Sequence, residues 1–199
     1  ADKSENGQYQ IFKNPFAQYV KANIEYAHTV RFNAKNSYAV RAGIGAAYAY
    51  GNSTILPFEK RFYGGGPNGV RGWRTRYLGP GSFSTEDVSD ISVHTGDLNL
   101  ILSAEYRYKL FKFLEAAAFM DAGNIWTLRD YENQPGGKFD ISDFYKEIAL
   151  GAGLGLRVDL SFLIVRFDFA KRVYDPSRPD GSRRWTFFSE GFKNNSAFY

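Results

Sequence analysis

Residues 147–162 read EIALGAGLGLRVDLSF, and their side chains alternate between two kinds. Every even-numbered position is apolar, whereas every odd-numbered position is small or charged. Period-2 alternation of this kind is typical of a β-strand with one apolar face. The alternating stretch is sixteen residues long, whereas strands of globular proteins average about 5–6 residues. A strand that crosses a membrane needs about 9–11 residues for the hydrocarbon alone, so the stretch is long enough to span one.

The same alternation predicts five further strands. They cover residues 19–32, 37–50, 97–110, 112–126 and 163–172, the last two with a weaker pattern. The expected connections alternate between short turns, at 33–36, 111 and 161–162, and long loops, at 51–96, 127–144 and from 173 onward. Bacterial barrels alternate short periplasmic turns with long extracellular loops, but a soluble β-sandwich has no reason to keep that order. We therefore predict an antiparallel transmembrane β-barrel whose short turns face the periplasm.

Composition agrees with this prediction and excludes other classes. Aromatic residues make up 18% of the chain, and several stand near strand ends (Tyr48, Tyr50, Tyr106, Tyr108 and Trp126), which suits an interfacial girdle. A transmembrane helix needs about 20 consecutive apolar residues, and the sequence contains no such run. The absence of cysteine excludes disulfides and thiolate metal sites. The net charge of +4 is scattered over the chain, so we do not expect nucleic-acid binding.

The number of strands is too small for a complete barrel. Bacterial barrels have an even number of eight or more strands, and only six are clear here. The chain would close on itself only if residues 8–13 and 184–192 each added a strand. The chain also begins at Ala1 without Met or a signal peptide, as expected of a processed protein or a fragment. We therefore predict that residues 1–199 form a single partial barrel domain of about six to eight strands.

The long loop at 51–96 carries the strongest functional signal. It contains the run Gly64-Gly65-Gly66 and several aromatic residues, and loops longer than about 12–15 residues are usually functional or disordered. A phosphate-binding loop would need a Walker-type spacing, which is absent. If the loop folds into the lumen, Arg71 would meet acidic side chains on the inward strand faces. These acids are Glu25, Asp97, Glu105, Glu115, Asp121, Asp159 and Asp168. The alternative is that Arg71 is a solvated loop cation.

Several segments resemble the BamA/TamA family of outer-membrane assembly barrels. Residues 62–66 (FYGGG) and 70–73 (VRGW) resemble the lumen loop of that family, and residues 119–124 (FMDAGN) resemble its Phe-x-Asp-x-Gly strand motif. Residues 153–157 and 166–170 resemble its late strands, so the likeness runs from about residue 16 to 170. Residues 56–60 (LPFEK) and 78–81 (LGPG) are similar to the Bacteroidetes branch, which includes TamA-like lipoproteins.

The resemblance implies a role for particular residues. It implies that Arg71 pairs with Asp121 and locks the loop inside the barrel, with Asp168 and Glu115 as further lumen partners. The corresponding loop motif consists of Gly65, Gly66, Val70, Arg71, Gly72 and Trp73. Neither a catalytic residue nor a metal or cofactor is implied. The two histidines, His28 and His94, have no paired ligand nearby in the sequence.

The resemblance also implies a function, although the sequence departs from the family pattern in two ways. We expect a non-enzymatic protein of the bacterial outer membrane that inserts or folds client outer-membrane proteins without nucleotide. Its partners would be outer-membrane lipid, client proteins, periplasmic POTRA domains and accessory subunits. However, the family carries POTRA repeats and a 16-strand barrel that closes on a C-terminal aromatic strand, and this sequence shows none of these. The alternatives are the barrel anchor of a surface patatin-like phospholipase, whose Gly-x-Ser-x-Gly elbow is absent here, and a two-partner-secretion transporter.

Overall fold

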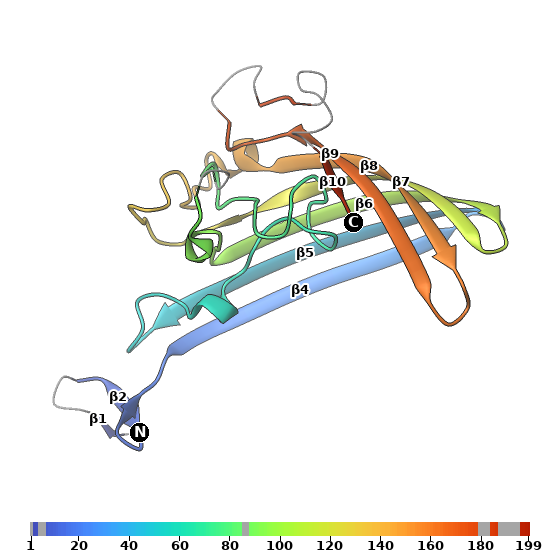
Figure 1. The fold of residues 1–199 in the computed structure, drawn as a ribbon. Coiled ribbons are helices and arrows are strands. Elements are labelled where there is room, and N and C mark those ends of the chain that lie inside the picture. The colour runs from blue at the N-terminus through green and yellow to red at the C-terminus, as the bar shows by residue number, and fades with distance from the viewer. Residues whose placement is uncertain (1, 4–6, 85–87, 179–183, 187–195) are drawn as a thin grey trace.

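The computed structural model describes residues 2–3, 7–84, 88–178, 184–186 and 196–199. Its main feature is an antiparallel sheet of seven strands, each paired with the next along the chain (Figure 1). The strands are β4 (Gln18–Arg31), β5 (Asn36–Tyr50), β6 (Leu98–Phe111), β7 (Leu114–Trp126), β8 (Ala149–Asp159), β9 (Ile164–Tyr174) and β10 (Ser196–Phe198). The six strands expected from the alternation are therefore confirmed to within about three residues at their ends, and the all-β antiparallel class is confirmed with them.

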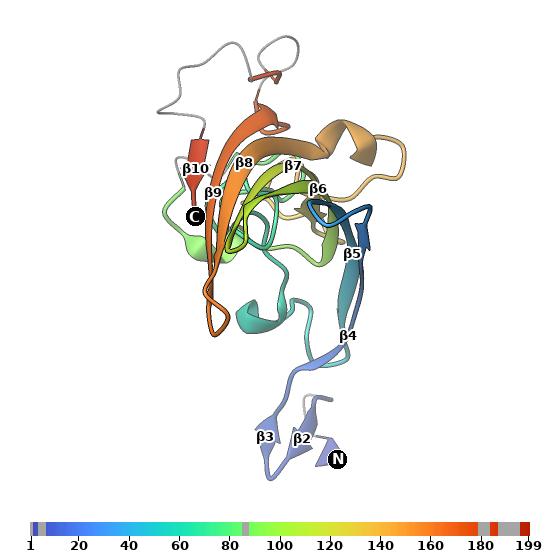
Figure 2. The same ribbon diagram turned by 90° about the vertical axis from the view of Figure 1, so that its right-hand side faces the viewer.

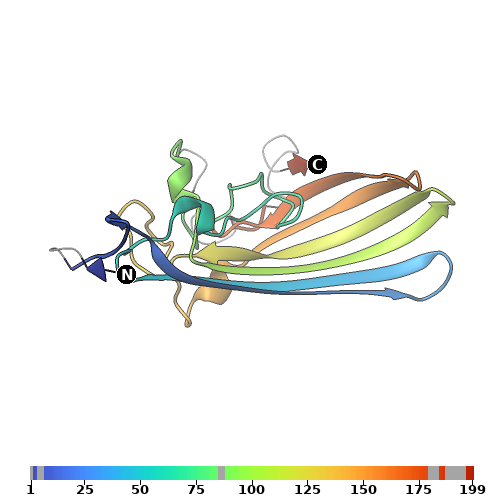
Figure 3. The ribbon, with the colours of Figure 1, turned by 90° about the horizontal axis from the view of Figure 1, so that it is seen from below.

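The sheet is strongly curved and stays open along its two outer strands (Figure 2). Short turns join the strands at one end, and long loops join them at the other end (Figures 1 and 3). The described parts of the long loops contain three short 3₁₀ helices, η1 (Phe58–Lys60), η2 (Ile91–Val93) and η3 (Phe144–Glu147). In the part of the chain that the structure describes, no helix is long and apolar enough to cross a membrane.

The two faces of the sheet differ in the way that the alternation predicts. The convex face exposes large apolar side chains, for example Ile44 at 60% and Leu154 at 66%. On β5, the intervening residues Gly43, Gly45 and Ala47 are buried on the concave face. An apolar outer surface suits lipid, and small inner residues leave room for another segment to lie against the sheet.

That other segment is the long loop at 51–96. Figure 2 shows it inside the concavity of the sheet, drawn in teal and green. A short bridge between Phe62 and Gly96 closes the base of the loop, and a second bridge joins Gly64 to Leu78. The loop is therefore an ordered element with its own pairing.

The N-terminal residues do not extend the main sheet. β1 (Asp2–Lys3), β2 (Tyr9–Ile11) and β3 (Asn14–Pro15) form a separate three-stranded sheet, which lies beyond the start of β4 (Figures 1 and 2). Closure of the chain on itself required residues 8–13 to add a barrel strand, and this condition is not met. The physical reason is a tight turn at Phe12 and Lys13, whose φ values of 51° and 67° fold the segment back on itself.

The second segment that closure would require as a strand, 184–192, lies mostly outside the described residues. Of its described part, 184–186, Trp185 makes a single bridge to Tyr174 of β9. The seventh strand of the sheet is instead β10, which pairs with β9 through Ala197 and Ala170. The described strands do not close a barrel.

Candidate functional site in the sheet concavity

A glycine-rich turn presents Arg71 to the sheet. Gly65 and Gly66 have φ values of +79° and +88°, a region that favours glycine because it has no Cβ. The Gly66 amide then donates to the Trp73 carbonyl at 2.8 Å and closes the turn. Val70 and Trp73, each 2% exposed, form a buried apolar cluster that also contains Leu78 and Ala149. Arg71 therefore stands between two apolar anchors.

Gly72 allows the loop backbone to touch the strands directly. A Cβ atom on Gly72 would lie 3.2 Å from the backbone nitrogen and Cα of Arg172 on β9. On the facing strand β8, a Cβ on Gly151 would lie 3.1 Å from the amide nitrogen of Gly72. These separations are tighter than ordinary van der Waals contacts, so the close approach depends on glycine at both positions.

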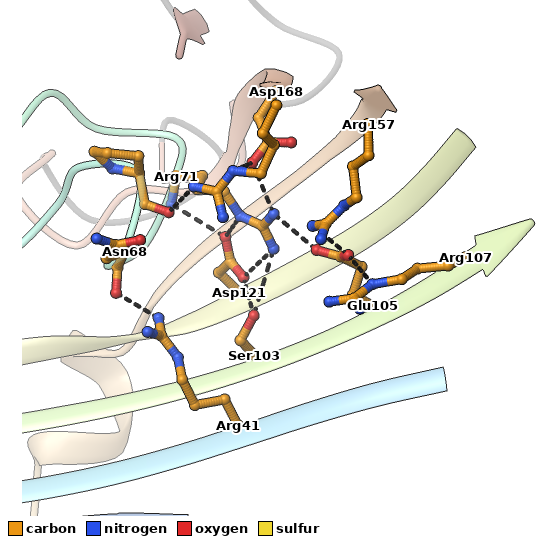
Figure 4. Close-up of polar contacts among 11 residues, drawn as sticks. Arg41, Asn68, Arg71, Ser103, Glu105, Arg107, Asp121, Arg157 and Asp168 are labelled. Carbon is orange, nitrogen blue, oxygen red and sulfur yellow. Dashed lines mark hydrogen bonds and ion pairs between the residues drawn. The ribbon is translucent and has the colours of Figure 1, made fainter. Parts of the chain in front are cut away.

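The side chain of Arg71 binds Asp121 of β7 through two parallel hydrogen bonds (Figure 4). Nε donates to Asp121 Oδ2 at 2.7 Å, and Nη2 donates to Oδ1 at 2.9 Å. The backbone amide of Arg71 also donates to Asp121 Oδ2, at 3.1 Å. Arg71 is 4% exposed and Asp121 is fully buried. Bidentate charge-assisted pairs of this kind are among the stronger hydrogen-bonded contacts in proteins.

Two further carboxylates complete the surroundings of the guanidinium. Nη1 of Arg71 donates to Glu105 Oε2 of β6 and to Asp168 Oδ2 of β9, both at 3.0 Å. Ser103 donates to Asp121 Oδ1 at 2.6 Å. We refer to Arg71, Ser103, Glu105, Asp121 and Asp168 as the Arg71 cluster. It joins the loop to three strands of the sheet, β6, β7 and β9.

An aromatic ring covers the face of the guanidinium. The central carbon of Arg71 lies 3.3 Å from the centroid of the Phe119 ring, and the negative face of such a ring attracts a cation. Phe119 is 5% exposed and stands two residues before Asp121 on the same face of β7. The motif at 119–124 therefore supplies both a carboxylate and a ring to Arg71.

The excess of negative charge around Arg71 is balanced by arginines from the strands. Arg107 donates to Glu105 Oε1 at 2.7 Å, and Arg157 also contacts that oxygen. Arg166 Nε lies 3.1 Å from Asp168 Oδ2. Burial by itself lowers the pKa of Arg71, but the hydrogen bonds and charges of Asp121, Asp168 and Glu105 outweigh it, so the pKa of Arg71 is raised. Arg71 therefore remains charged in this buried position.

The structure brings together some of the expected partners and not others. Asp121 and Asp168 both contact Arg71. Glu115, the third expected partner, is on the same strand face as Asp121 but six residues away, about 20 Å at the usual rise per residue. The expectation for Glu115 is therefore wrong, and Glu105 takes that place. The short turn predicted at residue 111 was the sequence signal that could have pointed to Glu105, because the β6–β7 hairpin that it forms pairs Ser103 with Asp121 and Glu105 with Phe119.

Comparison with known proteins agrees with this fold. Residues 6–190 match the Omp85 superfamily domain. The chain belongs to the Omp85 superfamily. It is thus part of an Omp85-type β-barrel of the bacterial outer membrane.

Two relatives show the likeness in detail. The outer membrane protein assembly factor BamA of Neisseria meningitidis serogroup B is 28% identical over 95 residues, which are 45% of this chain and 12% of the relative. The crystal structure of BamA from Haemophilus ducreyi lacking POTRA domains 1–3 superposes with a TM-score of 0.63 at 21% identity. That superposition covers 78% of this chain and 32% of the solved chain. The present chain therefore spans only a small part of the length of either relative.

Proposed function

We propose that this chain is part of a barrel that inserts or folds client outer-membrane proteins without nucleotide. The observation that carries the proposal is the Arg71 cluster, in which a loop arginine is buried against carboxylates of three strands. In this proposal, residues 1–199 form one partial barrel domain with the 51–96 loop folded into its lumen. The BamA proteins to which the chain is similar are named as assembly factors, which supports the same function.

The physical role proposed for the cluster is to fix the loop while other parts of the barrel rearrange. A client strand would pair with an open edge strand of the barrel through backbone hydrogen bonds. Pairing of this kind requires the edge to open, whereas the wall opposite it must keep its register. A loop bonded to β6, β7 and β9 holds those three strands together from inside, so opening would be confined to other strands.

Finer features of the proposal come from sequence alone. The segments at 56–60 and 78–81 support membership of the Bacteroidetes branch with TamA-like lipoproteins. The expected partners are outer-membrane lipid, client barrels, POTRA domains and accessory subunits. We propose that the barrel itself catalyses no reaction.

Replacement of Arg71 in the full-length protein tests this proposal. Arg71→Ala leaves three buried carboxylates without their shared cation, and loss of one partner of a buried ion pair costs about 3–5 kcal/mol. We expect assembly of client barrels to fall sharply, measured as the folded fraction of newly made outer-membrane proteins in cells that depend on the variant. Surface levels of the variant itself are measured in parallel.

Arg74→Ala is the matched control. Arg74 lies three residues further along the same loop and is exposed, so its loss removes the same charge without disturbing the cluster. We expect near-normal assembly with this variant. Normal client assembly by a correctly inserted Arg71→Ala protein would overturn the proposal. A selective loss of one secreted or surface-anchored protein, with other clients unaffected, would instead favour the transporter or phospholipase-anchor alternatives.

A further inference from the structure

A cavity of about 210 Å³ lies beside the Arg71 cluster, toward the short-turn end of the sheet. Four strand arginines line it in addition to Arg71, and Asn68 at the loop tip and Glu105 also border it. We refer to this cavity as the arginine pocket, and its four strand arginines are Arg41, Arg107, Arg157 and Arg166. Figure 4 shows Arg41, Arg107 and Arg157 coming from different strands toward this region.

The charges around the arginine pocket do not balance among the described residues. Glu105 forms ion pairs with three cations, Arg71, Arg107 and Arg157. Asp168 serves both Arg71 and Arg166. Arg41 has only the half-exposed Glu25 at 3.6 Å as its ion-pair partner in this part of the chain. With Asp121 included, five guanidinium groups face four carboxylates, which leaves a net positive charge.

Hydrogen-bond donors also remain available at the pocket. A guanidinium group carries five N–H donors, and Nε of Arg157 is buried with no hydrogen-bond partner in the described residues. An unpaired buried donor costs about 1–3 kcal/mol. Arg157 is thus the side chain with the most to gain from an added acceptor.

We propose that the arginine pocket binds a small soluble oxyanion of the size of phosphate. Arg107 and Arg157 would supply the main hydrogen bonds to the anion, because among the described residues these two arginines share a single carboxylate, that of Glu105. The charged lining residues stand on the concave face of the strands, so the anion would enter through the lumen. The convex face, which carries the exposed apolar side chains, gives a lipid headgroup no direct route to these donors.

Binding of the anion would also act on the loop. Arg166 donates to the carbonyl of Pro67 at 2.8 Å, and Arg41 donates to the carbonyl of Asn68. The same two arginines therefore hold the loop tip and line the cavity. An anion that neutralises their charge and fixes their side chains stabilises the loop tip in its present position.

Titration of the full-length protein in detergent tests the proposal. Inorganic phosphate is added at constant ionic strength and followed by ³¹P NMR and by calorimetry, with sodium acetate as a second titrant. We expect saturable binding, and tighter binding of phosphate than of acetate, because a tetrahedral oxyanion can accept from several arginines at once. Hydrogen exchange of the loop tip at 66–69 is expected to slow when phosphate is bound.

Two substitutions separate this pocket from general electrostatic attraction. Arg157→Gln removes the buried donor, and we expect phosphate affinity to fall about tenfold, as for a lost charge-assisted hydrogen bond. Arg107→Gln, at a more exposed position, is expected to have the same direction of effect and serves if the first variant does not fold. Lys109→Gln is the matched control, since Lys109 is two residues from Arg107 on the same strand face and does not line the cavity.

The outcome that supports the proposal is saturable phosphate binding that weakens in the arginine variants and persists in Lys109→Gln. Absence of saturable binding in the wild-type protein would overturn it. Equal weakening in all three variants would also overturn it, since that pattern reports only net charge. Binding of acetate more tightly than phosphate would reassign the pocket to a carboxylate ligand.

Discussion

Arg71 and Asp121 are fifty residues apart in the sequence, yet their side chains form a buried bidentate pair. Nε and Nη2 of the arginine lie 2.7 Å and 2.9 Å from the two carboxylate oxygens. Because Arg71 belongs to a loop and Asp121 to the centre of the sheet, this pair determines where the loop lies. The contribution of this pair to the free energy of unfolding can be measured directly.

A double-mutant cycle measures the coupling between these two residues. Asp121→Asn alone is expected to destabilise the folded barrel by about 3–5 kcal/mol, because Arg71 loses its nearest buried partner. Arg71→Lys should also destabilise it, since an ammonium group cannot reproduce the paired geometry. Urea unfolding of the full-length protein in detergent gives the four stabilities. Residues in direct contact show coupling of about 0.5–3 kcal/mol, and additive effects would argue against a direct pair.

Glu105 on β6 is expected to matter more than Glu115 on β7. Glu105→Gln leaves Arg71, Arg107 and Arg157 without the carboxylate that they share. Glu115→Gln is the matched control, because Glu115 is only partly buried and is about 20 Å from Asp121 along β7. We expect a loss of stability for Glu105→Gln of about 1–3 kcal/mol or more and almost none for Glu115→Gln. Equal losses would mean that Glu105 has no special role in the cluster.

Gly72 is predicted to tolerate no larger side chain. A Cβ on this residue would be 3.2 Å from the backbone of Arg172, and backbone atoms cannot rotate away as a flexible side chain can. Gly72→Ala should therefore lift the loop from β9 and expose it to protease. Limited proteolysis of the detergent-solubilised protein, with the wild-type protein digested in parallel, checks this. Unchanged protease resistance of Gly72→Ala would show that the strand can shift.

The positions of the strands could be predicted from the sequence more fully than the contacts between them. Alternation and loop length are local properties, so the long strands around 147–162 and 37–50 could be predicted from the residues alone. Alternation placed both Glu105 and Glu115 on the inward face but gave no position along the strand axis. For this reason Glu105 was only one of seven candidate acids, and Glu115 was wrongly named as a partner of Arg71. The turn at Phe12 was not foreseeable, because nothing in a Phe-Lys pair indicates positive φ values.

The buried His94 is expected to make the loop sensitive to acid. His94 is 1% exposed, and its ring lies edge-on to that of Tyr77, with the centroids 5.4 Å apart. Burial lowers the pKa of His94 below the ordinary value of 6.5. In the folded protein the imidazole therefore stays neutral to a lower pH than in the unfolded chain, where it takes up a proton below about pH 6.5. The stability that depends on the neutral ring is therefore complete above that pH and declines as the pH falls toward the folded-state pKa.

Comparison of urea midpoints at about pH 7.5 and about pH 5.5 measures this effect, since the lower value lies below the ordinary histidine pKa. We expect the wild-type protein to lose more stability on acidification than His94→Gln, in which the buried imidazole of the loop is gone. His28→Gln is the control, because His28 is exposed and only stacks on Tyr26, so it should follow the wild type. If His94→Gln and the wild-type protein respond equally to acid, another group is responsible and the assignment to His94 is wrong.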